Sequence, residues 1–277
     1  MRLSRRLSLA AALLLWGAAA PAGAGPARVV SLNVCTDQLA FMVGAPGQLV
    51  SVSPLGHDAR SASLAPDLRA IPANGASAEE VALMRPDLVL AGSYTARATV
   101  QMLERIGIRV ERFAPARSLD DVRRNIARMG DLLGRPARAA ALVDDFDARL
   151  ADLSDAPDAR PVVAYYLPFN ETASEDGLTG AILKAAGMTT IASALDLAGG
   201  ERLSLERLVL TRPDLILVGQ PYDSPAQATD LLQHPALRAT GTLRRIGGSA
   251  PWICGTPSTL DAVAAMRDLR LQWKAAR

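Results

Sequence analysis

Short apolar runs alternate with segments of helical periodicity along most of the chain. The β-branched run at residues 28–32 suits a buried strand, and residues 87–91 form an apolar strand with no polar alternation. Strands of that kind are typical of a parallel sheet that is covered on both faces. Further strands are predicted at residues 49–52, 110–113, 162–167 and at the end of 204–219. The alternation of strands with helices predicts doubly wound α/β lobes.

Polar residues and glycines mark where the shorter helices begin and end. Thr36 and Asp37 offer N-cap chemistry for a helix that Gly44 ends. Ser77 and Glu80 form a predicted capping box, in which each side chain accepts a hydrogen bond from a backbone amide at the helix start. Further helices are predicted at residues 95–106 and 178–186.

Two longer helical patterns interrupt the alternation. Residues 118–133 begin with a second predicted capping box, formed by Ser118 and Asp121, and residues 135–153 have apolar positions close to a 3.6-residue period. Residues 53–74 carry prolines and scattered charges and predict a long surface connection. We therefore expect one α/β lobe on either side of an all-helical middle.

One stretch of the chain occurs twice. Residues 77–92 read SAEEVALMRPDLVLAG and residues 204–219 read SLERLVLTRPDLILVG, with nine identities that include the Glu at the third position and the Arg-Pro-Asp-Leu core. Coincidence is the alternative, since a helix followed by Pro-Asp and a strand recurs in unrelated α/β proteins. A strand and a glycine-ended helix precede both copies, ending at Gly44 and Gly187. This matching order favours two lobes of one kind.

The first 24 residues have the three-part pattern of a secretory signal. Three arginines precede an apolar run at residues 7–20, and small residues follow up to Ala24, after which we expect cleavage. The run is shorter than the roughly 20 residues of a membrane span, and no lipobox cysteine closes it. Arg5-Arg6 partly resembles a twin-arginine signal, so export by the Sec route is expected and the twin-arginine route stays open. We expect a soluble product without a membrane anchor.

Charge and length limit the alternatives further. The 277 residues include 30 basic and 28 acidic side chains, and the signal holds three arginines and no acids, so the mature chain is close to neutral. A basic surface for nucleic acid therefore has little support. The length allows two compact lobes. The expected boundaries are a signal peptide at 1–24, an N-terminal lobe at 25–117, a helical linker at 118–157 and a C-terminal lobe at 158–277.

The mature chain resembles the periplasmic substrate-binding proteins of metal-chelate ABC importers, which include ferric-siderophore-, haem- and vitamin-B12-binding proteins. The resemblance rests on VVSLNVCTDQLAFMVG at residues 29–44 and on the two repeated stretches. It implies two α/β lobes joined by one long helix within residues 135–153, with the ligand in the cleft between the lobes. It also implies a monomer in the periplasm that delivers its ligand to a permease in the inner membrane.

Members of that family dock onto permease arginines through one Glu on the surface of each lobe. By motif position these are Glu79 and Glu206. A carboxylate in the first turn of a helix lies near the positive end of the helix dipole and can accept a bidentate arginine. A surface Glu that is favoured by the dipole alone is the alternative, and the recurrence of the Glu in both repeats favours docking.

Ligand contacts are expected in the loops at the carboxyl ends of the strands, where clefts in such folds lie. These loops are residues 33–37, 53–60, 93–97, 166–174 and 249–256. Aromatic faces and a few cations suit a large, flat, partly anionic chelate. The candidate ligand-binding residues are Cys35, His57, Arg60, Tyr94, Arg97, Tyr166, Phe169, Trp252 and Cys254. For each aromatic residue, packing within its own loop is the alternative.

Three of these candidates have chemistry beyond packing. His57 is a possible axial contact to a metal centre, although the only other histidine, His234, offers no second imidazole nearby in sequence. Cys35 and Cys254 lie on loops of different lobes, and three roles stay open for them: a disulfide, thiolate contact with a soft metal, or plain packing. We assign no metal site directly.

A secreted enzyme that processes a chelate is the hypothesis from a different class. The sequence has no Gly-x-Ser-x-Gly, His-Glu-x-x-His, P-loop or dinucleotide motif, so we expect no catalytic residues and no resident cofactor. The expected function is capture of an iron chelate of the siderophore type and its delivery to an ABC importer. A corrinoid such as vitamin B12, or haem, is the alternative ligand.

Overall fold

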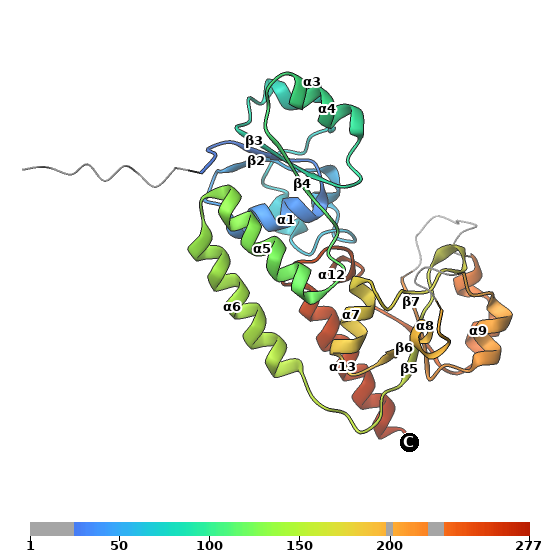
Figure 1. Ribbon diagram of the computed structural model, residues 1–277. Helices are drawn as coiled ribbons and strands as arrows, with labels where there is room; N and C mark the ends of the chain where they lie inside the picture. The colour runs from blue at the N-terminus through green and yellow to red at the C-terminus, as the bar shows by residue number, and fades with distance from the viewer. Residues whose placement is uncertain (1–24, 198–201, 221–229) are drawn as a thin grey trace, which may run out of the picture.

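The structure, a computed structural model, describes residues 25–197, 202–220 and 230–277. It has two α/β lobes, with the N-terminal lobe at the top of Figure 1 and the C-terminal lobe at the lower right. Each lobe contains a four-stranded parallel sheet with helices on both faces. The doubly wound α/β prediction is confirmed. The predicted signal peptide lies outside the described residues.

The N-terminal sheet has the strand order β2-β1-β3-β4. Leu88 and Leu90 of β3 pack into one apolar cluster with α1 and α5, whereas Val89 faces the opposite cluster with α3 and α4. All five residues of β3 are buried, because helices cover both faces. The elements are β1 (Val29–Ser31), α1 (Val34–Val43), β2 (Leu49–Ser51), η1 (Pro54–His57), α2 (Ala65–Leu68), α3 (Ala78–Leu83), β3 (Leu88–Gly92), α4 (Arg97–Arg105) and β4 (Val110–Phe113).

The C-terminal sheet repeats this topology in the order β6-β5-β7-β8. The first strand of each lobe is therefore central, and the repeated stretch supplies the strand that pairs with it on one side. The elements are β5 (Val162–Tyr165), η2 (Pro168–Asn170), α7 (Leu178–Ala185), β6 (Thr189–Thr190), α8 (Ile191–Ala194), α9 (Leu205–Thr211), β7 (Leu215–Val218), η3 (Leu231–Gln233), α11 (Pro235–Ala239), β8 (Leu243–Arg245), α12 (Ala250–Ile253) and α13 (Thr259–Ala275).

Two helices connect the lobes, α5 (Leu119–Leu133) and α6 (Pro136–Leu153), and α6 runs along the side of the molecule (Figure 1). Ser118 and Asp121 form the predicted capping box at the start of α5. The largest apolar cluster includes residues of both sheets together with Ile126 of α5 and Phe146 of α6. The lobes thus share one core, which restricts how far they can separate. Within the described residues, no helix is both long and apolar enough to cross a membrane.

The two copies of the repeat have the same local structure. Arg85 and Arg212 both have a positive φ, of 49° and 50°, and each helix ends here because a following proline disfavours the right-handed helical conformation. The Asp87 carboxylate then accepts the backbone N–H of Arg28 at 2.8 Å, and the Asp214 carboxylate accepts that of Val162 at 2.8 Å. Each Asp therefore holds the start of the central strand of its lobe.

Three local predictions are corrected. Asn33, rather than Thr36 or Asp37, is the N-cap of α1, so the helix begins earlier and buries both residues. Residues 53–74 contain η1, α2 and a bridge to the sheet instead of only a surface connection. Ser77 accepts a hydrogen bond from the Glu80 amide as predicted. The Glu80 carboxylate, however, accepts the N–H of Gly75 at 2.7 Å instead of that of Ser77, so the reciprocal half of the capping box is formed two residues earlier in the chain.

Asp37 is a fully buried acid in α1 without a cationic ion-pair partner among the described residues. Its carboxylate accepts hydrogen bonds from the backbone N–H and the hydroxyl of Ser53. Burial raises the pKa of Asp37 to about 7, although hydrogen bonds from Ser31 and Ser53 and the proximity of His57 oppose this shift. The ionised carboxylate therefore destabilises the fold near neutral pH.

Replacing Asp37 with Asn should stabilise the protein at alkaline pH. Because the native pKa is about 7 and the unfolded pKa is about 4, the wild type loses stability as the pH rises between these values. The Asn variant should exceed the wild-type free energy of unfolding by a few kcal/mol at about pH 8. This advantage should vanish by about pH 4, as measured by urea denaturation. A constant difference across this range would contradict the assignment.

Candidate functional site

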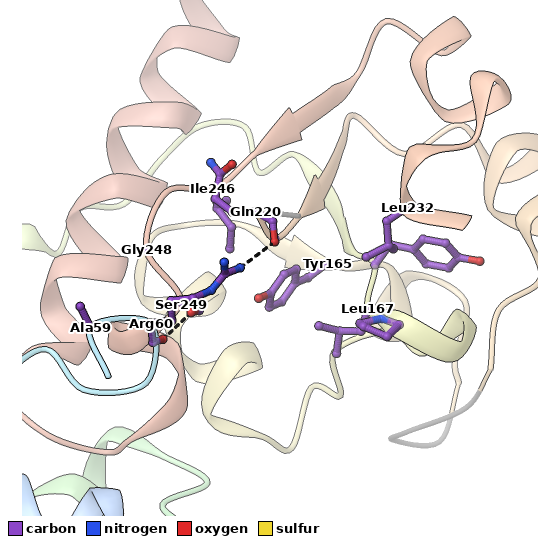
Figure 2. A pocket seen from close by; sticks show the side chains of 12 residues that line it. Ala59, Arg60, Tyr165, Leu167, Gln220, Leu232, Ile246, Gly248 and Ser249 are labelled. Atoms are coloured by element: carbon purple, nitrogen blue, oxygen red, sulfur yellow. Dashed lines mark hydrogen bonds between the residues drawn. The ribbon is translucent and has the colours of Figure 1, made fainter. Parts of the chain in front are cut away.

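A cavity of about 380 Å³ lies at the carboxyl ends of β5, β7 and β8, where the two lobes meet. Figure 2 shows its lining side chains. The C-terminal lobe supplies most of the wall, and the N-terminal lobe supplies two residues from the loop after η1. The lining residues are Ala59, Arg60, Tyr165, Tyr166, Leu167, Pro168, Gly219, Gln220, Leu232, Ile246, Gly248 and Ser249. Cavities of this size and composition bind small molecules.

Arg60 connects the two lobes at the cavity. Its guanidinium donates to the backbone carbonyl of Gln220 at 3.3 Å, and its own carbonyl accepts from the Ser249 hydroxyl at 2.5 Å (Figure 2). Asp58 holds the local turn, because its carboxylate accepts from the backbone N–H of Arg60 and from the Ser61 hydroxyl. The two hydrogen bonds lower the pKa of Asp58. The predicted ligand-binding residue Arg60 thus lies at the cavity.

Aromatic and aliphatic side chains form the floor of the cavity. The Tyr165 ring packs on Trp252 with a centroid separation of 5.2 Å, and Leu167 and Ile246 lie on either side of the cavity (Figure 2). Burial raises the pKa of the Tyr165 phenol, so this group is neutral at physiological pH. The surface offered to a ligand is therefore mainly apolar and uncharged.

The other aromatic candidates are placed differently. Tyr166 lines the cavity but is fully buried, and its hydroxyl donates to the Leu203 carbonyl at 3.1 Å. Trp252 is 9% exposed and supports Tyr165 from behind. Tyr94 is 89% exposed and Phe169 64% exposed, and neither lines the cavity. Arg97, in the first turn of α4, is also exposed and away from the cavity.

His57 is half-buried and already engaged within its own lobe. Its Nε2 atom lies 2.9 Å from the carbonyl oxygen of Ile71, and the residue does not line the cavity. No group of three or more His, Cys, Asp or Glu side chains suited to a metal occurs in the described part of the chain. The cavity therefore provides walls and hydrogen bonds rather than a set of metal ligands.

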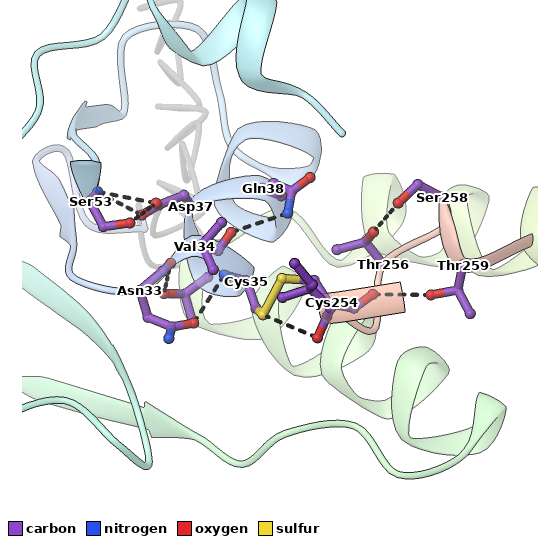
Figure 3. The surroundings of a disulfide bond; sticks show 12 residues. Asn33, Val34, Cys35, Asp37, Gln38, Ser53, Cys254, Thr256, Ser258 and Thr259 are labelled. Atoms are coloured by element: carbon purple, nitrogen blue, oxygen red, sulfur yellow. Dashed lines mark hydrogen bonds between the residues drawn. A yellow bond between two sulfur atoms is a disulfide. The ribbon is translucent and has the colours of Figure 1, made fainter. Parts of the chain in front are cut away.

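Cys35 and Cys254 form a disulfide that links the lobes (Figure 3). Cys35 lies in the first turn of α1, and Cys254 follows α12. The neighbouring Gly255 packs so closely on Ala116, just before α5, that a Cβ atom there would lie 2.2 Å from the Ala116 side chain. Of the three roles left open for the cysteines, the structure selects the disulfide. A bonded sulfur is no thiolate, so the two cysteines are unavailable as metal ligands.

Comparison with known proteins identifies the family. The family model described as periplasmic binding protein matches residues 29–245. The chain belongs to the periplasmic binding protein family. The proteins named cobalamin-binding protein in two strains of Halobacterium salinarum are 34% identical over 216 residues, which cover 76% of this chain and 58% of each relative. The chain thus spans little more than half the length of these relatives.

Solved structures share the fold of this binding protein. A periplasmic haem-binding protein from Roseiflexus sp. RS-1 superposes with a TM-score of 0.71 at 22% identity, and the match covers 88% of this chain and 99% of that one. The periplasmic vitamin B12-binding protein of Vibrio cholerae gives 0.65 at 19% identity, over 90% and 98% of the two chains. The matched family is one of binding proteins, in agreement with the prediction that the chain is not an enzyme.

The sequence alone missed several cavity residues of this binding protein. Tyr165 lies inside a predicted strand, and Gln220, Leu232 and Ile246 lie outside the five loops in which ligand contacts are expected. The signal was present, because Gln220 follows the apolar strand of the second repeat. Clefts in such folds lie at the carboxyl ends of the strands, and this rule applies to the strand before Gln220 as well.

Neither of the two predicted docking glutamates lines the cavity. Glu79 and Glu206 are exposed in the first turns of α3 and α9. These helices are at the top of the N-terminal lobe and at the right-hand edge of the C-terminal lobe (Figure 1). Hydrogen bonds from its own backbone amide and from the Ser204 hydroxyl lower the pKa of Glu206, so this carboxylate stays ionised.

Replacing both cysteines with serine should weaken the folded state and leave the cavity intact. The bridge closes a loop with a sequence separation of 219 residues, and such a cross-link stabilises by about 2–5 kcal/mol. The urea midpoint of the double variant should be lower than that of the wild type. Reductant should leave the midpoint of the double variant unchanged. Alkylation of the wild type without reductant, read by mass spectrometry, should label neither cysteine. Two labelled cysteines would contradict the bridge.

Proposed function

We propose that this binding protein captures a metal chelate in the interlobe cavity and delivers it to an ABC importer. Two lobes that meet at a mainly apolar cavity, with one guanidinium and a few amide and hydroxyl groups, support selective binding of a large organic ligand. The periplasm is the proposed compartment, a monomer the proposed state and a cleaved signal peptide the proposed route. In this proposal the protein binds its ligand and docks onto the importer, and it carries out no covalent chemistry.

A corrinoid is the chelate that the cavity favours. Arg60 is the one cationic side chain among the described lining residues, whereas a triply anionic ferric catecholate would require more positive charge to replace its hydration. A corrinoid carries neutral amides around a flat ring and suits aromatic and aliphatic walls with a few hydrogen-bonding groups. The relatives named cobalamin-binding protein support the same choice.

A ferric siderophore is the second candidate. Arg60 lies at the point where both lobes contribute to the cavity and could neutralise part of an anionic chelate. In either case the metal would enter as part of the ligand, since no group of three or more His, Cys, Asp or Glu side chains suited to a metal occurs among the described residues.

Tryptophan fluorescence should distinguish these ligands. Trp252 packs on Tyr165, which lines the cavity, so an absorbing ligand there should quench its emission. We expect cyanocobalamin to bind the mature protein with a Kd below about 1 μM, and ferric siderophores and haemin at least about tenfold more weakly. The bound corrinoid should be recovered unchanged by mass spectrometry.

The Trp252→Phe variant is the control for the origin of the signal. It keeps an aromatic ring behind Tyr165 and retains Trp273, which lies at the end of α13. Quenching should fall sharply, while the affinity from calorimetry stays within about threefold of wild type. If no chelate in the panel bound below about 10 μM, the proposed ligand class would be wrong.

Delivery requires a docking surface, for which Glu79 and Glu206 are the proposed centres. Both carboxylates are exposed at equivalent positions of the two lobes. Such carboxylates suit arginines presented by the permease. Because neither glutamate lines the cavity, we expect docking and ligand binding to be separable by mutation.

Reversing both charges, Glu79→Arg with Glu206→Arg, should abolish stimulation of the transporter ATPase and leave chelate affinity unchanged. Two repulsive contacts would replace two attractive ones. The matched control reverses Asp144 and Asp145, two exposed acids of α6, and should retain stimulation. The assay uses the cognate permease–ATPase complex, reconstituted in lipid nanodiscs. Full stimulation by the glutamate double variant would exclude these residues as docking points.

A further inference from the structure

One exposed leucine follows each docking glutamate by four residues. Leu83 is 83% exposed at the end of α3, and Leu210 is 81% exposed near the end of α9. Residues four apart lie on the same face of a helix. Each lobe therefore presents a carboxylate and an isobutyl group side by side to solvent.

The two pairs are held in equivalent frames. Ser77 and Ser204 each accept a hydrogen bond at 3.2 Å from the backbone N–H three residues later, which fixes the start of each helix. The left-handed arginine and the aspartate that follow fix the end, as described above. The geometry that relates Glu to Leu is thus specified by the same contacts in both lobes.

The residues that directly follow the members of each pair are less alike. The residue after the glutamate is Glu80 in one lobe and Arg207 in the other, and the residue after the leucine is Met84 or Thr211. A single exposed leucine is ordinary on a protein surface. Two that exceed 80% exposure at the same position of a repeat, each beside the same acid, are not explained by packing, because neither contributes to the core.

We propose that the pairs Glu79–Leu83 and Glu206–Leu210 form two equal footprints for a membrane permease that presents two equivalent sites. Each site would offer a cation to the carboxylate and an apolar pocket to the leucine. This inference rests on the proposed docking function. The carboxylates steer association and make it dependent on salt, whereas burial of the leucines contributes a component that salt does not screen.

The arrangement of the two footprints indicates what kind of partner binds them. The footprints lie on different lobes, in α3 and α9, and share their order and spacing. A partner that matches both must repeat its own recognition site, as a symmetric pair of subunits does. Exposed glutamates beside leucines suit arginines, whose aliphatic stems pack on leucine while the guanidinium binds the carboxylate.

The test measures binding of the ligand-loaded protein to the same permease–ATPase nanodiscs by biolayer interferometry. Leu83→Ala and Leu210→Ala should each weaken binding about tenfold, since each removes buried alkyl surface. The double variant should lose about a hundredfold, because the footprints lie in separate lobes and act independently. The loss should be equal at about 0.05 M and about 0.5 M salt, and the Leu→Met variants should retain wild-type affinity.

Leu271→Ala, which trims another exposed leucine on α13, is the matched control and should bind normally. If the glutamate reversals abolish docking while both alanine variants bind within twofold of wild type, the apolar half of the footprint is wrong and the docking proposal stands. If neither set changes binding, both are wrong. A concentration-dependent dimer of wild type that Leu83→Ala dissociates would make a second copy the occupant and would also overturn the inference.

Discussion

The carboxylates of Asp87 and Asp214 support the rest of the structure. Each aspartate directly follows the proline at the end of a helix. Its carboxylate accepts the backbone N–H at the start of the central strand of its lobe. These contacts align β1 with β3 and β5 with β7, and the parallel register follows. The helix that carries the exposed glutamate precedes this aspartate in each lobe, and the carboxyl ends of β5 and β7 reach the cavity.

The contacts between the lobes limit how far the cavity can change shape when a ligand binds. A shared apolar core, the Cys35–Cys254 disulfide and the hydrogen bonds of Arg60 all join the two halves. Opening that separated the lobes widely would expose this core and break the disulfide, so movement around the cavity is limited to small adjustments. A binding protein of this kind selects its ligand through a largely preformed surface, which agrees with walls made of packed tyrosine, leucine and isoleucine.

Predictions of helix ends and turns were confirmed where a single interaction between residues close in sequence determines the local structure. The proline of each repeat, the capping box at Ser118 and the glycine after α7 act within a few residues, and the structure has these features where the sequence placed them. Asn33, rather than Thr36 or Asp37, is the N-cap of α1, because burial of Val34, Thr36 and Asp37 within the first turn outweighs the local capping preference of the latter two. Tyr94 was expected in the cleft because of its loop, but the loop points it into solvent.

The sequence by itself determined the two-lobed α/β architecture, the equivalence of the lobes and the positions of Glu79 and Glu206, because strand periodicity, proline turns and the repeat are local patterns. Only the tertiary structure decided that Cys35 meets Cys254, that Arg60 reaches Gln220, and that Tyr165 faces the cavity with Trp252 behind it. These contacts join residues distant in the chain, and they depend on how the lobes pack together, a relation for which a single sequence contains no local signal.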